Sequence, residues 1–214
     1  MQIQCAAFLF DLDGVLVDSS AVVERVCRQW AQRHDLDPQM VLRIAHGRRS
    51  RDTVHAVAPH LDIVREAASI DDAELRDVEG LREVAGVRRF LANLDPGRWA
   101  VVTSCGRDLA RLRLSSVGLP IPKIVETSED VSQGKPAPDG YRLGAQRLGY
   151  QARACVVFED APSGIAAGRA AGARVVGLRT TDPDADFSGA DVSIADFTSV
   201  HVQRYEDGYV LTLD

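Results

Sequence analysis

Residues 6–15 read AAFLFDLDGV, a short apolar run that ends in two carboxylates. An apolar run bounded in this way predicts a buried β-strand. In a regular strand Asp11 and Asp13 would point to opposite faces, so both reach one site only if the chain turns at once, and Gly14 permits that turn. Two carboxylates beside a core are costly to desolvate, and a bound divalent cation would offset that cost. The stretch therefore predicts the first strand of a core with an acidic site at its end.

The composition is that of an ordinary globular protein. The 214 residues suffice for one domain, or for one domain with an insertion, and 45% are hydrophobic and 26% charged. A net charge of −6 argues against a general nucleic-acid binder, although local arginines can still bind anionic substrates. The four cysteines form no C-x-x-C pair, which disfavours a disulfide or zinc framework and fits a reducing compartment.

The apolar run at residues 3–10 is the one stretch that invites comparison with a membrane or targeting segment. It is too short to cross a bilayer, no basic segment precedes it, and Asp11 ends it. We therefore expect a soluble, cytoplasmic protein without a membrane partner. A monomer is the default expectation.

Residues 18–80 carry helical signals and no strand signals. Asp18 and Ser19 form a favourable helix N-cap, and apolar residues then recur at helical spacing. Further helical patterns follow, with proline and glycine between them, at 39–45, 51–58 and 63–78. This part of the chain is predicted to be an all-helical unit.

From residue 84 onward, strand and helix signals alternate. Strands are predicted at 98–103, 123–126, 154–158 and 174–178, and helices at 87–94, 108–117, 138–148 and 163–171. Such alternation is typical of βαβ units and a parallel sheet. We predict an α/β fold, with a doubly wound parallel sheet formed by residues 1–17 and 81–214 and split by the helical unit at 18–80. Asp207-Gly208, flanked by RYE at 204–206 and YVL at 209–211, predicts a terminal hairpin.

Several chemically active residues are predicted to share one edge of this sheet. In open α/β sheets, ligands bind beyond the carboxyl ends of the strands. The residues that follow the core strands, or lie in a loop between them, are Asp11, Asp13, Thr103, Ser104, Lys135, Glu159 and Asp160.

This set of side chains supports phosphoryl transfer through a carboxylate nucleophile. Asp11 would attack phosphorus, and Asp13 would protonate the leaving alcohol and then take a proton from the attacking water. The Thr103 hydroxyl and the Ser104 backbone N–H would bind phosphate oxygens. Lys135 would supply positive charge to the nucleophile and the transferring phosphate.

The acidic residues also predict a metal site. Asp160, and Glu159 directly or through water, would hold a cation together with Asp11. Ligand sets made only of oxygen atoms suit Mg²⁺, which would neutralise charge on the phosphate. Mg²⁺ is therefore the predicted cofactor, and a small phosphorylated metabolite is the predicted partner.

Four motifs in order resemble those of the haloacid dehalogenase-like hydrolases. They are D-x-D-G-V at 11–15, Thr103, Lys135-Pro136 and Glu159-Asp160. The helical unit between the first and second motifs is similar to the small cap of the β-phosphoglucomutase-like subfamily. The resemblance covers residues 6–180 and implies a Rossmann-like core, Mg²⁺ dependence and a mobile cap domain that closes over the substrate.

The resemblance also implies a second role for Asp13, which would bind the metal through its backbone carbonyl. The resemblance also implies that the dehalogenases of this family do without the second aspartate, because a halide leaves without a proton. The presence of Asp13 therefore favours a phosphate ester whose alkoxide leaves poorly.

The stretch HGRRSRD at 46–52 combines a glycine turn with three guanidinium groups. It is similar to the cap loop of sugar-phosphate, polyol-phosphate and glycerol-3-phosphate phosphatases. Because guanidinium groups suit phosphates and hydroxylated ligands, Arg48 and Arg49 are candidate substrate contacts. Ion pairs with Asp52 or other surface acids are an equally good interpretation.

We therefore expect a Mg²⁺-dependent phosphatase of small sugar or polyol phosphates that acts through an aspartyl phosphate. A β-phosphoglucomutase-like phosphomutase is the first alternative. Mutases, however, have a histidine where this chain has Val23, and a Gly-x-x-Arg loop where residues 47–50 read GRRS. A second alternative is a catalytically idle relative that binds a metabolite or a partner protein.

Overall fold

The computed structural model describes residues 1–213. The strands within this range are β1 (Gln2–Cys5), β2 (Ala7–Phe10), β3 (Val17–Asp18), β4 (Arg82–Glu83), β5 (Trp99–Val102), β6 (Val125–Glu126), β7 (Cys155–Glu159), β8 (Arg174–Leu178), β9 (Val192–Ile194), β10 (Val200–Tyr205) and β11 (Gly208–Leu213). The helices are α1 (Ser20–Arg33), α2 (Pro38–Ala45), α3 (Ser50–Val57), α4 (Ile63–Leu75), α5 (Val87–Ala92), α6 (Arg107–Ser116), α7 (Asp139–Arg147) and α8 (Pro162–Ala171), with a 3-10 turn at Ala152–Ala154.

The core is a six-stranded parallel sheet in the order β6-β5-β2-β7-β8-β9. Strand β2 lies between β5 and β7, and Phe10 is in register with both Val101 and Phe158. This register brings the carboxyl ends of three strands from distant parts of the sequence to the same level. The edge on which the sequence analysis placed its site residues is therefore continuous.

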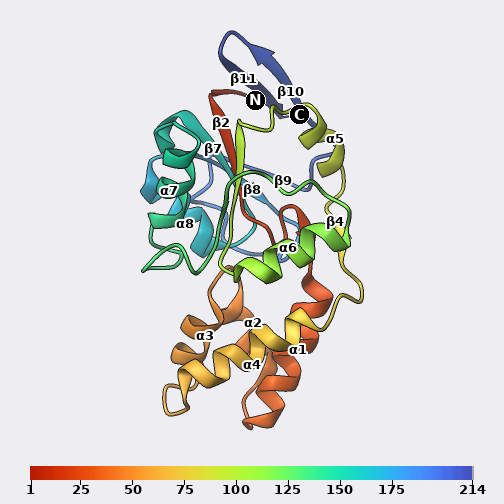
Figure 1. Ribbon diagram of the computed structural model, residues 1–214, viewed down its shortest axis with the longest axis vertical. Coiled ribbons are helices and arrows are strands. Elements are labelled where there is room, and N and C mark those ends of the chain that lie inside the picture. Colours follow the sequence, from red (N-terminus) through yellow and green to blue (C-terminus); the bar gives the residue numbers. More distant parts are fainter. Residues whose placement is uncertain (214) are drawn as a thin grey trace.

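Side chains of β2 alternate between two apolar layers, as the period of a strand requires. Phe8 and Phe10 belong to the layer that α5 and α6 complete, and Ala7 and Leu9 belong to the layer under α7 and α8. Figure 1 shows these two pairs of helices on opposite faces of the sheet. The predicted doubly wound α/β fold is confirmed.

The segment between β3 and β4 folds as four helices with an apolar core of their own, built around the fully buried Trp30. The indole Nε1 donates to the carboxylate of Glu66 at 3.0 Å, which satisfies the buried polar atom. These helices lie at one end of the molecule, below the sheet in Figure 1. The helical prediction for this segment is confirmed, and the domain boundaries at 17/18 and 80/81 stay predictions.

The start of α1 differs from the expected cap. Ser19 occupies the N-cap position, but its side chain makes no capping hydrogen bond. Its hydroxyl donates instead to Asp13 Oδ1 at 2.6 Å, and Asp18 accepts from the amide of Ser20 at 3.2 Å. Because its acceptor is a carboxylate, the hydrogen bond of Ser19 to Asp13 is of the strong, charge-assisted kind.

The two connections between the sheet and the four helices run side by side. Strands β3 and β4 pair antiparallel, with Val17 opposite Glu83 and Asp18 opposite Arg82. Asp18 and Arg82 also form an ion pair at 3.0 Å. The sequence did not indicate this short pairing.

The predicted terminal hairpin is confirmed as β10 and β11, with Glu206 in the left-handed region at φ 51°. Strand β1 adds to it and completes a three-stranded antiparallel sheet. This sheet lies at the end of the core remote from the four helices (Figure 1). It seals the apolar layer there, because Tyr209 packs 5.2 Å from Phe8 between ring centroids.

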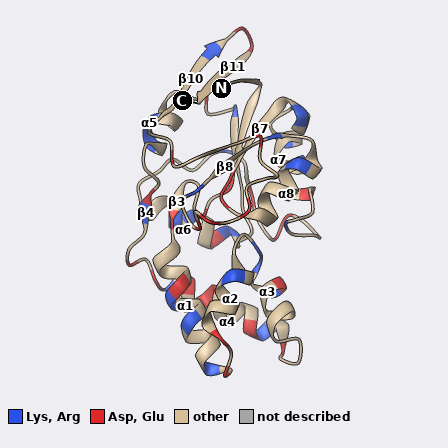
Figure 2. Cartoon of the chain, turned by 180° about the vertical axis from the view of Figure 1, so that it is seen from behind, with Lys and Arg blue, Asp and Glu red and all other residues tan. Residues whose placement is uncertain are grey.

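Basic and acidic residues occur on both the sheet part and the four-helix part of the chain (Figure 2). Within residues 1–213, no helix combines the length and the apolar character needed to cross a bilayer.

The stacked pair Phe10–Phe158 lies at the centre of the sheet, with ring centroids 5.1 Å apart. Both side chains are fully buried. We predict that Phe158→Ala lowers the free energy of unfolding by about 3–5 kcal/mol, because it removes apolar contacts and leaves a cavity. Urea denaturation measures the effect. The control Val64→Ala, at a side chain that is 75% exposed, should change it by less than about 0.5 kcal/mol. Equal effects of the two variants would contradict the packing described here.

Candidate active site

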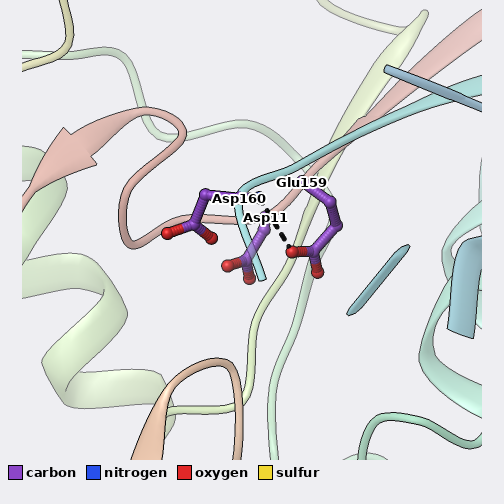
Figure 3. A group of neighbouring side chains, drawn as sticks. All are labelled: Asp11, Glu159 and Asp160. Atoms are coloured by element: carbon purple, nitrogen blue, oxygen red, sulfur yellow. Dashed lines mark hydrogen bonds between the residues drawn. The ribbon is translucent and has the colours of Figure 1, made fainter. Parts of the chain in front are cut away.

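Three carboxylates meet at the carboxyl ends of neighbouring strands. Asp11 follows β2, Glu159 ends β7, and Asp160 is the next residue. One oxygen from each lies within 4.8 Å of the others, and all three residues are buried. Figure 3 shows their side chains converging from the two adjacent strands. The predicted convergence of the first and last motifs is thus present in the fold.

Lys135 bridges two of these carboxylates. Its Nζ donates to Asp11 Oδ1 at 2.6 Å and to Glu159 Oε1 at 2.5 Å, with only 8% of the residue exposed. Burial lowers the pKa of Lys135, but the carboxylates of Asp11 and Glu159 outweigh it and raise the pKa overall. Lys135 is therefore a fixed positive charge at the centre of the site.

Glu159 is held by four donors. Besides Lys135, the hydroxyl of Tyr141 donates to Oε1 at 2.6 Å, and the amides of Asp160 and Ala161 donate to Oε2 at 3.1 and 3.3 Å. Tyr141 was not singled out in the sequence analysis. Its only sequence signal is that it follows the Lys135-Pro136 motif on the buried face of a helix.

Two glycines make room for the acidic side chains. A Cβ on Gly164 would lie 1.7 Å from Glu159 Oε1, and a Cβ on Gly14 would lie 2.0 Å from Asp160 Oδ2. Gly14 also has φ +72°, which other residues rarely adopt. It allows the chain to turn directly after Asp13, as the sequence analysis expected.

The donor set fits a divalent cation. Burial raises the pKa of Asp11 to about 7, although Lys135 opposes the shift. Burial, Glu159 and Asp11 raise the pKa of Asp160, whose Oδ2 also accepts from the hydroxyl of Thr181. Desolvated carboxylates held close together repel one another, and a bound divalent cation relieves that repulsion.

Thr103 and Ser104 follow β5, next to Asp11. The Thr103 hydroxyl accepts from the amide of Cys105 at 3.2 Å, which fixes the turn after the strand. The Ser104 hydroxyl donates to the carbonyl of Gly47 at 2.9 Å and so joins the sheet part to the helical part. Phosphate binding by Thr103 and Ser104 stays a prediction.

Asp13 lies in the turn after β2, two residues beyond Asp11. Its Oδ2 accepts from Arg113 at 2.5 Å, and its Oδ1 accepts from Ser19. The sequence did not indicate a site role for Arg113, because an arginine within an amphipathic helix is normally a surface residue.

A cavity of about 580 Å³ lies between the helical part and the sheet edge. Asp11, Asp13 and Asp160 line its floor, and residues of α1–α4, Val23 among them, line its roof together with Arg48 of the loop between α2 and α3. The cavity is large enough for a small metabolite.

The two predicted substrate arginines differ in position. Arg48 lines this cavity, whereas Arg49 does not. Arg49 pairs with Asp52 at 2.5 Å and donates to the Ser132 carbonyl at 3.2 Å, so it links the helical part to a core loop. The ion-pair interpretation therefore describes Arg49, and its contact with substrate stays a prediction.

A doubly wound α/β core with a buried acidic and lysine-bearing centre beneath an inserted helical unit defines a capped α/β enzyme. Residues 8–178 match the family model described as haloacid dehalogenase-like hydrolase. The chain belongs to this family, which confirms the resemblance drawn from the four motifs.

Similar proteins cover almost the whole chain. Hexitol phosphatase A of Escherichia coli (strain K12) is 38% identical over 97% of this chain and 99% of its own length. Glycerol-1-phosphate phosphohydrolase 2 of Saccharomyces cerevisiae is 34% identical over 96% of this chain and 88% of its own. The crystal structure of a hydrolase from Pseudomonas syringae has a TM-score of 0.78 and 26% identity, covering 88% of this chain and 92% of that one. The similarity therefore includes both the sheet and the helical unit.

The room beneath Glu159 generates a prediction about Gly164. In a helix, alanine is favoured over glycine by up to about 1 kcal/mol, but the added methyl would collide with the Glu159 carboxylate. We predict that Gly164→Ala lowers the free energy of unfolding by about 1–3 kcal/mol. Urea denaturation again measures it. The matched control is Gly97→Ala, where a Cβ meets nothing within 4 Å and should leave stability nearly unchanged. A more stable Gly164→Ala protein would refute this account of Glu159.

Proposed function

We propose that this chain is a Mg²⁺-dependent phosphatase that hydrolyses small sugar or polyol phosphate monoesters through an aspartyl phosphate. One observation carries the proposal: the Asp11 carboxylate, held by Lys135 at 2.6 Å, lies at the floor of a cavity that the helical unit covers. A fixed carboxylate beside a fixed ammonium is suited to attack an anionic phosphorus centre.

Asp11 is the nucleophile. Lys135 binds Oδ1, and within the described chain Oδ2 accepts no hydrogen bond, so it is free to form the bond to phosphorus. As the Asp11–phosphorus bond forms, the bond from phosphorus to the substrate oxygen breaks. Lys135 stabilises the charge on the transferring group, while Thr103 and the Ser104 amide orient its oxygens.

Asp13 moves the protons of both steps. It gives a proton to the leaving alkoxide, which would otherwise leave poorly. It then takes a proton from the water that attacks the aspartyl phosphate, and this second step releases inorganic phosphate and restores Asp11. Each proton that Asp13 donates is thereby recovered, and the net reaction is hydrolysis.

The metal would be held by Asp11, Asp160 and the backbone carbonyl of Asp13. Glu159, whose oxygens already accept four hydrogen bonds, would contribute through water while it fixes Lys135. When bound, Mg²⁺ would supply neutralising charge to the phosphate oxygens. An oxygen-only site at this position is consistent with that choice of metal.

Hydrolysis is favoured over phosphomutase activity by the lining of the cavity. Val23, where the mutases have a histidine, lines the cavity and offers no group to bind or transfer a proton. The two similar proteins named above are, by name, a phosphatase and a phosphohydrolase. Both act on polyol phosphates according to their names, which supports the same substrate class here.

Residues 18–80 would act as the cap, with Arg48 as the substrate contact that lines the cavity. The four cysteines are free thiols, which is consistent with a reducing, cytoplasmic location. A monomer acting on a small metabolite, without nucleic acid or membrane, completes the proposal.

A panel of phosphate monoesters tests the activity. We predict phosphate release from polyol or sugar phosphates in the presence of Mg²⁺, and a loss of at least about 1,000-fold in kcat for Asp11→Asn, because the nucleophile is removed. Asp72→Asn, an exposed carboxylate on α4, is the matched control and should retain full activity. Malachite-green detection of phosphate measures both.

Three outcomes would contradict the proposal. Unchanged release by Asp11→Asn would remove its role. Conversion of glucose 1-phosphate into glucose 6-phosphate, stimulated by a bisphosphate and with little free phosphate, would indicate a mutase. Binding of phosphorylated ligands without turnover would indicate an idle relative.

Metal removal provides a separate prediction. Treatment with EDTA should abolish hydrolysis, and added Mg²⁺ should restore it. Asp160→Asn should raise the Mg²⁺ concentration for half-maximal activity by at least about 10-fold, since it removes a ligand. Full activity in EDTA, or an unchanged Mg²⁺ requirement in this variant, would refute the metal site.

A further inference from the structure

Arg113 connects the helical unit to the proposed proton-transfer residue. It lies on α6, at the boundary between the sheet and the four helices (Figure 1), and only 2% of it is exposed. Its Nη1 donates to Asp13 Oδ2 at 2.5 Å, and its Nη2 donates to Glu74 Oε2 at 2.6 Å. Glu74 belongs to α4, so a single guanidinium group spans the two parts of the chain.

Both carboxylate oxygens of Asp13 accept hydrogen bonds. Ser19, at the start of α1, donates to the second oxygen of Asp13 at 2.6 Å. Within the described residues, Arg113 is the only cation hydrogen-bonded to Asp13 or to Glu74. Asp13 is therefore held by one residue of the core and one at the entrance to the helical unit.

Charge explains why this contact is specific. Burial lowers the pKa of Arg113, but Asp13 and Glu74 raise it overall, so the guanidinium stays charged. Burial raises the pKa of Glu74, and Arg113 opposes that shift. Asp71 and Cys105 are the other ionisable groups near Arg113. A rigid, planar fork with two carboxylates at fixed positions constrains both of them, which a flexible point charge would not do.

We propose that Arg113 is a positioning residue for Asp13, and that Glu74 holds the Arg113 guanidinium in place when the helical unit lies against the core. The inference rests on the proposed function, because it concerns the proton that Asp13 passes to the leaving alkoxide. When α4 is seated on the core, Glu74 fixes one edge of the guanidinium, and the other edge fixes the Asp13 carboxylate. Covering the cavity and orienting the acid then become a single event.

The distinguishing readout is the leaving group. An alkoxide needs a proton from Asp13, whereas p-nitrophenolate leaves without one. Single-turnover kinetics with p-nitrophenyl phosphate, followed by nitrophenolate release, report formation of the aspartyl phosphate alone. The same step with glycerol phosphate reports formation of the intermediate together with proton donation.

We expect Arg113→Met to lower the single-turnover rate with glycerol phosphate by at least about 10-fold, a part of what general acid catalysis contributes. Its KM should stay within about 3-fold of wild type, and so should its rate with p-nitrophenyl phosphate, since Arg113 acts on proton donation. Arg113→Lys should restore part of the loss. Arg111→Met, an exposed arginine on the same helix, is the matched control and should behave as wild type.

Glu74→Gln keeps the test decisive if Arg113→Met does not fold. Glutamine has nearly the same shape and does not touch Asp13, so a selective loss of about 3-fold or more with glycerol phosphate supports the coupling. Equal losses with both substrates, or no loss, overturn it. If wild-type activity depends on Asp11 but Arg113→Met has no effect, the inference alone is refuted. If the wild-type protein shows no hydrolysis, the proposed function is refuted, and the inference falls with it.

Discussion

The pairing of the Lys135 ammonium group with the carboxylates of Asp11 and Glu159 is the interaction on which the rest of the site depends. A buried lysine is costly without partners, and so is each buried carboxylate beside it. Asp11 and Glu159 satisfy the lysine, and the lysine in turn allows two acids to lie side by side at neighbouring strand ends. Tyr141, on α7, completes the arrangement by donating a hydrogen bond to Glu159. Removal of Lys135 would leave the buried Asp11 and Glu159 carboxylates without the cation that pairs with both.

The sheet makes this arrangement possible. Asp11 and Glu159 face each other because Phe10 and Phe158 are in register, and that register is fixed by the stacked rings and the apolar layers on both faces. Gly164 then leaves the space that the Glu159 side chain needs. Core packing thus sets the positions of the site residues. Apolar substitutions far from the cavity can therefore displace the acidic centre.

The predictable part of the molecule is the part encoded locally. The strand before Asp11 and the turn at Gly14 follow from short patterns, and the order of the motifs then places Asp160 at the same sheet edge. Long-range partners are different. Arg113 has the sequence context of a surface residue, and only the packing of α6 against α4 reveals its two carboxylate partners. The same holds for Ser19, whose local signal is a helix cap and whose actual partner, the Asp13 carboxylate, comes from the preceding turn.

The pairing of β3 with β4 restricts how the two parts of the enzyme can rearrange. Both crossings of the chain are hydrogen-bonded to each other, so neither can slide or twist without the other. A rotation of the helical unit about this small ladder would leave the pairing intact. Elsewhere the two parts are joined by the hydrogen bonds of Ser104 with the Gly47 carbonyl and of Arg49 with the Ser132 carbonyl, and by the buried Arg113–Glu74 ion pair. Such a rotation would break these polar contacts before any contact in the ladder, so the cost of admitting a ligand would fall chiefly on the buried Arg113–Glu74 ion pair.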